Sequence, residues 1–336
     1  MRTRVGVVAA IAVAIVAWMS VNYAEAAPAR PVVTNRATYR LVEAAASTAR
    51  EPRAPRSVGH VYRALRYGPE SRQQLDLYVP ARSRFPGPWP TILWLHSGGW
   101  RSSDRSETTP LVQRELDRGF AVASVDYGLA PEVRFPTPVA DVKLAVRWTK
   151  AMGARYGLDS KTVFVAGGSA GGYLAAMVGA TPGRFEPRAV PPALRRVDDT
   201  VAGVVDLVGP TDLTTFDHES PGTALGDYAS SLGDLFLGCA DPHAPRARCA
   251  ARERRASIAP YVTDAAPPIF MVYGATDELV PPRTQALPLA STWAARAGPN
   301  TVWVQVVARA GHNLEHVNVH ALDRFLAAAI SRRAHD

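Results

Sequence analysis

The chain has 336 residues, 47% of them hydrophobic, which is enough to bury a substantial core. Its formal net charge is +8, and the arginines are scattered along the chain without the pattern of a nucleic-acid-binding module. This argues against a nucleic-acid partner and leaves open a weak association with an acidic cell envelope. The cysteines and histidines match no metal-ligand spacing, so we expect no metal.

Residues 1–26 have the layout of a signal peptide. Two arginines near the start precede an apolar stretch over residues 5–19, and small residues follow at a plausible cleavage site. We therefore expect the protein to be secreted or held in the cell envelope, with a mature chain that begins near Ala27. The alternative is an uncleaved membrane anchor. Residues 27–57 are rich in Ala, Arg and Pro, which predicts a loosely structured lead-in or a short cap element.

Strand-like and helix-like runs alternate over residues 58–336. This alternation predicts one α/β domain with a mostly parallel, twisted sheet and helices on both faces. Residues 73–79 alternate like an outer strand, and apolar positions at helical spacing predict a helix over about 138–156. The segment of about 182–267 is expected to be an insertion that forms a small cap.

A buried strand over residues 91–95 ends in the sequence HSGGW at 96–100. When a nucleophile attacks a carbonyl group, the oxygen becomes an anion that fixed N–H donors must stabilise in a water-poor site. Gly98 and Gly99 offer backbone N–H groups that no side chain blocks, which predicts an oxyanion hole; the alternative is an ordinary loop leaving a strand. Trp100 follows directly and either lines a substrate pocket or packs in the core.

The run 163–172 ends in Gly-x-Ser-x-Gly and continues into a helix of small residues. A serine attacks a carbonyl well when it lies at the apex of a sharp turn between a strand and a helix, and flanking glycines remove the clashes that such a turn creates. Ser169 is therefore the predicted nucleophile, and the N–H of Ala170 is a further oxyanion donor. Tyr173 lies just beyond and, like Trp100, either lines the pocket or packs in the core.

The two cysteines of the chain, Cys239 and Cys249, lie in the insertion between the strands expected near Val205 and Phe270. Export would permit a disulfide between them. A pair of free thiols is the alternative, because sequence spacing alone does not decide between the two.

The strand-like run at 268–274 leads into a loop with two acids, Asp277 and Glu278. Open α/β sheets bind ligands at the carboxyl ends of their strands, so an acid there is placed to orient a histidine. The last strand-like run, 301–308, leads to His312. An imidazole titrates near neutrality, which suits a general base that takes the serine proton and returns it to the leaving alcohol.

Together these motifs resemble the α/β-hydrolase esterases of the hormone-sensitive-lipase-like group, and within it the bacterial carboxylesterases related to feruloyl and acetylxylan esterases. The resemblance spans about residues 60–332, and it favours Asp277 over Glu278 as the acid. It rests on HSGGW at 96–100, DYGLAPE at 126–132 with Phe135, Pro136 and Asp141, AVRW at 145–148, the serine motif at 167–172, Asp277 with Val280 and Pro281, and Gly311 with His312. The chain departs from the family at Ser97, where a glycine is usual, and at Gly128, where an arginine is common.

The motifs predict an exported serine carboxylesterase that acts on small-molecule esters with short acyl groups. Ser169 would attack the ester, His312 would relay the proton, and Asp277 would orient His312, so that an acyl-enzyme forms and water releases the acid. This catalysis needs no cofactor. A serine amidase or peptidase would use the same three residues. A non-catalytic binding protein on this scaffold is the other alternative, since fold does not determine function.

Overall fold

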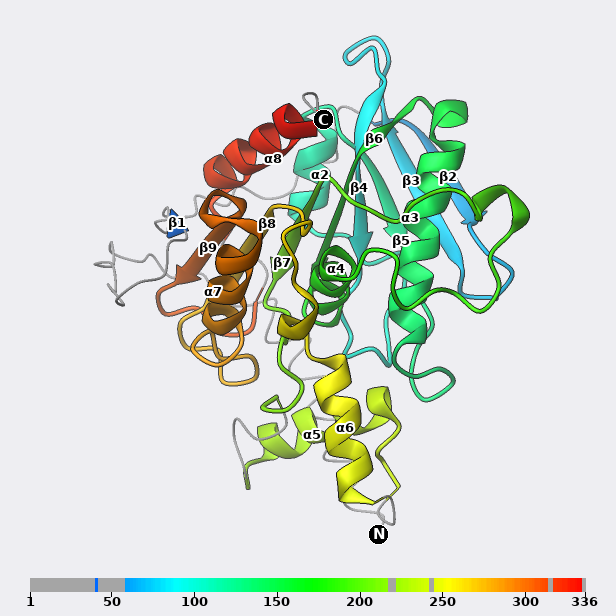
Figure 1. Ribbon diagram of the computed structural model, residues 1–336. Helices are drawn as coiled ribbons and strands as arrows, with labels where there is room; N and C mark the ends of the chain where they lie inside the picture. The colour runs from blue at the N-terminus through cyan, green and yellow to red at the C-terminus, as the bar shows by residue number, and fades with distance from the viewer. Residues whose placement is uncertain (1–39, 42–57, 217–221, 242–244, 314–316, 334–336) are drawn as a thin grey trace.

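The computed structural model describes residues 40–41, 58–216, 222–241, 245–313 and 317–333. These residues form one nine-stranded sheet, in which the strands lie in the order β1-β9-β8-β7-β6-β4-β5-β3-β2 (Figure 1). The strands are β1 (Arg40–Leu41), β2 (Val58–Arg66), β3 (Gln74–Pro80), β4 (Trp89–Leu95), β5 (Ala121–Val125), β6 (Leu158–Gly168), β7 (Gly203–Leu207), β8 (Ile269–Gly274) and β9 (Val302–Val307). Because β3 is antiparallel to both of its neighbours and the other pairs are parallel, the predicted mostly parallel sheet is confirmed.

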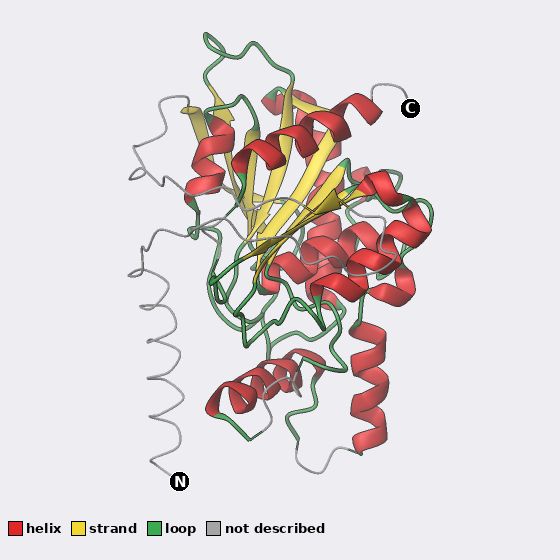
Figure 2. Cartoon of the chain, turned by 90° about the vertical axis from the view of Figure 1, so that its left-hand side faces the viewer, coloured by secondary structure: helices red, strands yellow, loops and turns green. Residues whose placement is uncertain are grey.

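Helices cover both faces of the sheet, as the side view in Figure 2 shows. The helices are α2 (Pro110–Leu116), α3 (Thr137–Tyr156), α4 (Ala170–Ala180), α5 (Ala224–Leu237), α6 (Arg246–Ala256), α7 (Ala286–Ala297) and α8 (Val319–Arg333), with short 3-10 turns at Pro192–Leu194, Ala259–Tyr261 and Pro299–Thr301. The helix predicted over about 138–156 is α3, which ends at Gly157 in the left-handed conformation that favours glycine.

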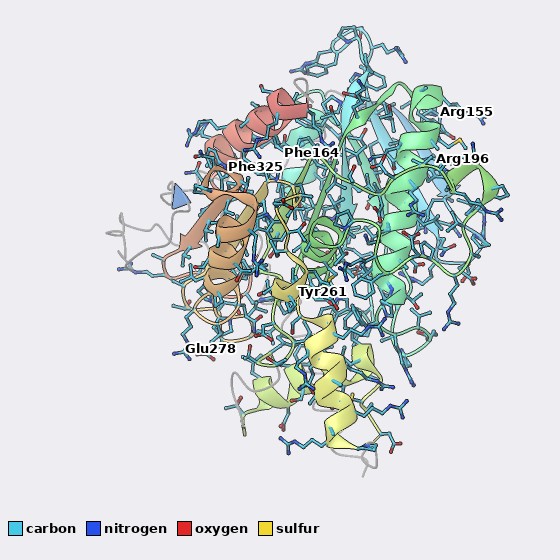
Figure 3. All side chains as sticks on the ribbon, in the orientation of Figure 1. Arg155, Phe164, Arg196, Tyr261, Glu278 and Phe325 are labelled. Carbon is cyan, nitrogen blue, oxygen red and sulfur yellow. A yellow bond between two sulfur atoms is a disulfide. The ribbon has the colours of Figure 1, made fainter. Side chains whose placement is uncertain are left out.

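The hydrophobic residues of the sheet divide into two cores, one on each face. In β4, Leu93 and Leu95 pack in the core with α3, α4 and α7, whereas Ile92 packs in the core with α2 and α8. The second core also contains Phe164 of β6 and Phe325 of α8, both labelled in Figure 3. The central strands β5, β7 and β8 are buried at every position, which is why their sequences are mostly apolar.

The insertion predicted at about 182–267 is wrong in its extent. The strand expected near Val205 is β7, which lies within those bounds as a central strand between β6 and β8, because the sequence GVVDL is apolar enough to be buried on both faces. The cap is the narrower excursion between β7 and β8, where α5 and α6 project below the body in Figure 1. The structure confirms the disulfide between Cys239 and Cys249, which joins the end of α5 to the first turn of α6.

The signal-peptide prediction at 1–26 lies outside the described residues, as does most of the lead-in at 27–57. The exception is β1, which pairs in parallel with β9 at the edge of the sheet. The sequence did not predict this strand, because its two residues have no pattern of their own. Within the described ranges, no helix combines the length and the apolar character needed to span a bilayer.

Candidate active site

Ser169 is the single residue between the end of β6 and the start of α4. Its backbone has φ 52° and ψ −115°, a strained conformation for a residue with a side chain. A Cβ built on Gly167 would lie 2.5 Å from the carbonyl carbon of Gly171, and one built on Gly171 would lie 2.1 Å from the carbonyl oxygen of Leu95. The first turn of α4 therefore packs directly against β4, and only glycines allow this sharp turn.

Ser169, His312 and Asp277 form one chain of hydrogen bonds. His312 Nε2 lies 3.0 Å from Ser169 Oγ, and His312 Nδ1 lies 2.8 Å from Asp277 Oδ2. With Nδ1 donating to the carboxylate, Nε2 is left as an acceptor that faces the serine hydroxyl. The structure thus brings together the three side chains that the sequence analysis selected. Glu278 takes no part in this chain and lies exposed at the outer edge of the molecule (Figure 3).

The Asp277 carboxylate is buried and held by the backbone. Its Oδ1 accepts hydrogen bonds from the N–H groups of Leu279 and Val280, at 3.0 and 2.9 Å, while Oδ2 faces the imidazole. Thr276 donates from both its N–H and its hydroxyl to the carbonyl oxygen of Ala310, each at 2.9 Å. These bonds tie the loop after β8 to the loop after β9, which sets Asp277 and His312 at a fixed separation.

The proposed oxyanion donors lie at the same end of the sheet. Gly98, Gly99 and Trp100 all have positive φ, at 100°, 58° and 58°. A Cβ on Gly98 would lie 2.4 Å from the carbonyl oxygen of Ser102, so a side chain is excluded at that position. Ala170 is the first residue of α4, where a helix N–H has no acceptor within the helix and the helix dipole favours a negative charge.

Trp100 and Tyr173 are packed in the core. Their exposed fractions are 1% and 0%, and both contact Phe236 of α5, Trp100 by stacking and Tyr173 edge to face. The Tyr173 hydroxyl donates to the carbonyl oxygen of Ala256 at the end of α6, at 2.8 Å. Of the two alternatives in the sequence analysis, the structure therefore supports core packing, and these rings join the oxyanion loop and α4 to the cap.

A buried carboxyl lies beside the serine turn that the sequence analysis did not select. Asp206 of β7 is opposite Gly167, accepts from the Tyr273 hydroxyl at 2.6 Å and accepts from the Gly209 N–H at 2.9 Å. Burial raises the pKa of Asp206 from 3.8 to about 7, although both hydrogen bonds act in the opposite direction. A lone acid in an apolar run was the available signal, but only the fold shows that both faces of β7 are covered.

The raised pKa of Asp206 predicts that the free energy of unfolding depends on pH. The folded state binds the Asp206 proton more tightly than the unfolded state does. The contribution of Asp206 to the free energy of unfolding therefore falls as the pH rises from the pKa of the unfolded state to that of the folded state. Relative to Asp206→Asn, the wild type should lose about 2–3 kcal/mol of stability between roughly pH 5 and pH 8. Urea unfolding of both proteins across that range measures this difference, and a pH-independent difference would contradict the prediction.

Within the described ranges, no group of three His, Cys, Asp or Glu side chains is arranged to hold a metal ion. The sheet order, the serine turn and the three hydrogen-bonded side chains define the class of the protein, which is an α/β-hydrolase. The chain belongs to the BD-FAE family, which matches residues 75–292. The resemblance stated from the sequence motifs is thereby confirmed.

Several relatives from Mycobacterium tuberculosis are named esterases. Esterase LipQ is 27% identical over 225 residues, which cover 64% of this chain and 48% of LipQ. Esterase LipC is 30% identical over 222 residues, which cover 65% of this chain and 52% of LipC. The chain thus spans about half the length of these relatives.

Solved structures share the fold at low sequence identity. A truncated carbohydrate esterase from gut microbiota has a TM-score of 0.70 and 20% identity, with 83% of this chain and 98% of that protein covered. Esterase B from Lactobacillus rhamnosis has a TM-score of 0.64 and 22% identity, with 84% of this chain and 89% of that protein covered.

Proposed function

We propose that this protein is an exported serine carboxylesterase that hydrolyses short-chain acyl esters. The observation that carries the proposal is the hydrogen-bonded chain from Ser169 through His312 to the buried Asp277, with the serine at the apex of a strained turn. Kinship with proteins named esterases supports the same chemistry. The signal-like layout of residues 1–26 and the disulfide in the cap support export, because disulfides persist in oxidising compartments.

The reaction proceeds in two halves. Ser169 Oγ attacks the ester carbonyl while His312 Nε2 takes the serine proton, and the N–H groups of Gly98, Gly99 and Ala170 stabilise the resulting oxyanion. The tetrahedral intermediate collapses, His312 returns the proton to the leaving alcohol, and an acyl-enzyme remains. Water then attacks the acyl-enzyme with His312 again as the base, which frees the acid and regenerates the hydroxyl.

The packing around the oxyanion loop supports a preference for short acyl groups. A Cβ built on Gly99 would lie 2.7 Å from Leu232 of α5, so the cap contacts the loop at that point. Trp100, Tyr173 and Phe236 fill the adjoining space with close ring contacts. A long acyl chain that entered this region would have to displace buried aromatic rings, which contribute strongly to the stability of the core.

The proposal is tested with purified protein on p-nitrophenyl esters from acetate to laurate and on p-nitroacetanilide. We expect kcat/KM to be highest for acetate or butyrate and to fall steeply for longer chains, with the anilide hydrolysed much more slowly than the acetate. Preferential hydrolysis of the anilide would instead favour the amidase alternative. N-terminal sequencing of the protein released by the producing cell is expected to begin near Ala27, and a retained segment 1–26 would contradict cleavage.

The two neighbouring acids predict opposite results on substitution. Asp277→Asn removes the charge that orients His312 and stabilises its protonated form, so kcat should fall by about 10³- to 10⁴-fold. Glu278→Gln removes an exposed charge one residue away and should leave kcat unchanged. Steady-state kinetics on p-nitrophenyl acetate compare the two variants. Equal losses, or a loss only in Glu278→Gln, would show that the acid is assigned incorrectly.

A further inference from the structure

Glu107 binds the loop that carries two of the proposed oxyanion donors. Its Oε1 accepts from both the N–H and the hydroxyl of Ser97, at 3.0 and 2.5 Å, and its Oε2 accepts from the Ser103 hydroxyl at 2.5 Å. Three donors of one loop therefore converge on a single carboxylate, and hydrogen bonds to an ionised acceptor are the stronger kind. Ser97 is also the position where this chain departs from the glycine of the related esterases, and only a residue with a hydroxyl can make the second of these bonds.

The segment that presents Glu107 is anchored to the sheet. Arg105 donates from its backbone N–H to Asp126 Oδ1 at 2.7 Å and from its guanidinium to Asp126 Oδ2 at 2.5 Å. The hydroxyl of Ser124, in β5, donates to the carbonyl oxygen of Arg105 at 2.7 Å. Asp126 and Ser124 are both buried at the end of β5. The Glu107 carboxylate thus extends from a fixed support, which is what a group needs in order to position another.

The bonds to Ser97 determine how the Gly98 N–H is directed. The carbonyl group of Ser97 and the N–H of Gly98 belong to one rigid peptide plane. His96 Nδ1 donates to that carbonyl at 2.8 Å, while Glu107 holds the N–H and side chain of the same residue. Gly98 itself is free to adopt many backbone conformations, so the direction of its N–H depends on the residue before it.

We infer that Glu107 is a positioning residue of the oxyanion hole and that it acts through Ser97. The inference rests on the proposed esterase function. The Gly98 N–H meets a full negative charge only in the transition state, so its orientation matters more for kcat than for the binding of the neutral ester. Without the Glu107 carboxylate, the Ser97–Gly98 peptide keeps its bonds from His96 and Tyr127 at the carbonyl oxygen but loses the restraint on the Ser97 side. The peptide can then turn about its carbonyl contact, and a misdirected Gly98 N–H stabilises the oxyanion less.

The test measures kcat, KM and the inhibition constant of a trifluoromethyl ketone, which forms a tetrahedral oxyanion on the serine, for a set of variants. Glu107→Ala should lower kcat on p-nitrophenyl acetate by about 10- to 100-fold with KM unchanged, and should weaken the ketone by a similar factor. Ser97→Ala should lose less, because its N–H still reaches Glu107. The double variant should lose no more than Glu107→Ala alone, since both changes break one unit. Glu107→Gln keeps an acceptor oxygen and should recover most of the activity.

Asp104→Asn is the matched control, because it removes an exposed carboxylate from the same loop and that side chain accepts from Ser106 rather than from Ser97. It should leave all three constants unchanged.

The inference is overturned if Glu107→Ala raises KM at constant kcat, if the ketone binds Glu107→Ala as tightly as it binds the wild type, or if the losses of Ser97→Ala and Glu107→Ala add. Should Glu107→Ala not fold, the same three measurements on Ser97→Ala and Glu107→Gln decide. If the wild type hydrolyses no ester, the proposed function itself is overturned. If the wild type is active, Ser169→Ala abolishes the activity and Glu107→Ala leaves it unchanged, the inference alone is overturned.

Discussion

Replacing Ser169 by alanine is expected to lower kcat/KM for p-nitrophenyl acetate by about 10⁴-fold or more, while the folded structure is retained. The substitution removes the only atom that attacks the ester. It removes little else, because the hydroxyl makes no capping hydrogen bond to the α4 helix that it precedes. Alanine at φ 52° is as strained as serine, so the backbone of the turn should keep its conformation.

The measurement pairs steady-state kinetics with thermal unfolding of the same preparations. Ser169→Gly is an informative companion, since glycine adopts φ 52° without strain. We expect Ser169→Gly to be equally inactive but more stable than Ser169→Ala, by up to about 1–2 kcal/mol. Undiminished hydrolysis by either variant would remove Ser169 from the mechanism, and with it the proposed function.

Replacing Gly171 by valine is expected to have the largest effect on stability, with a cost of more than about 4 kcal/mol. A Cβ at this position would lie 2.1 Å from the carbonyl oxygen of Leu95 and 2.7 Å from that of His96. Leu95 ends β4, a central strand paired on both sides with β5 and β6, and the carbonyl oxygen of His96 accepts from the buried Tyr127 hydroxyl at 2.8 Å, so neither oxygen can move without loss of hydrogen bonds. Helix α4 would have to withdraw from the sheet, which opens a cavity in the main core.

Gly233→Ala is the matched control. This glycine also lies in a helix, α5, but its nearest neighbour to an added Cβ is a side-chain atom of Phe216 at 4.0 Å. Alanine there should leave stability unchanged or raise it by about 0.5–1 kcal/mol through helix propensity. Denaturant unfolding of the three proteins compares them. If Gly171→Val unfolded at the wild-type midpoint, the close contact between α4 and β4 would not exist in solution.

The sequence predicted the local features at the end of the sheet where Ser169, Asp277 and His312 lie. Strands β8 and β9 begin and end within a residue or two of the predicted runs, because each is a short apolar segment bounded by turn residues. The turn at Ser169 could be predicted because the serine and its flanking glycines form one short motif. Ser169, Asp277 and His312 could be ordered along the chain and matched to a family, although no pattern in the sequence measures the distance between them.

Features that depend on distant partners were misjudged or missed. The bounds predicted for the insertion, about 182–267, ran across β7 although a strand was expected near Val205, since the central place of β7 is decided by its neighbours β6 and β8 rather than by its own composition. Whether Trp100 and Tyr173 line a pocket or pack in the core depended on their contacts with Phe236 of the cap. The contact between Glu107 and Ser97 was missed because it joins residues ten positions apart in a loop that has no periodic pattern.

By itself, the sequence determined the class of fold, the identity of the nucleophile and the order of its partners, because periodicity, turn chemistry and motifs act over short stretches of chain. Only the tertiary structure decided how near Asp277 lies to His312, which aromatic residues are buried, and that a carboxylate holds Ser97. Those outcomes are set by hydrogen bonds and packing between segments that the fold alone brings within reach.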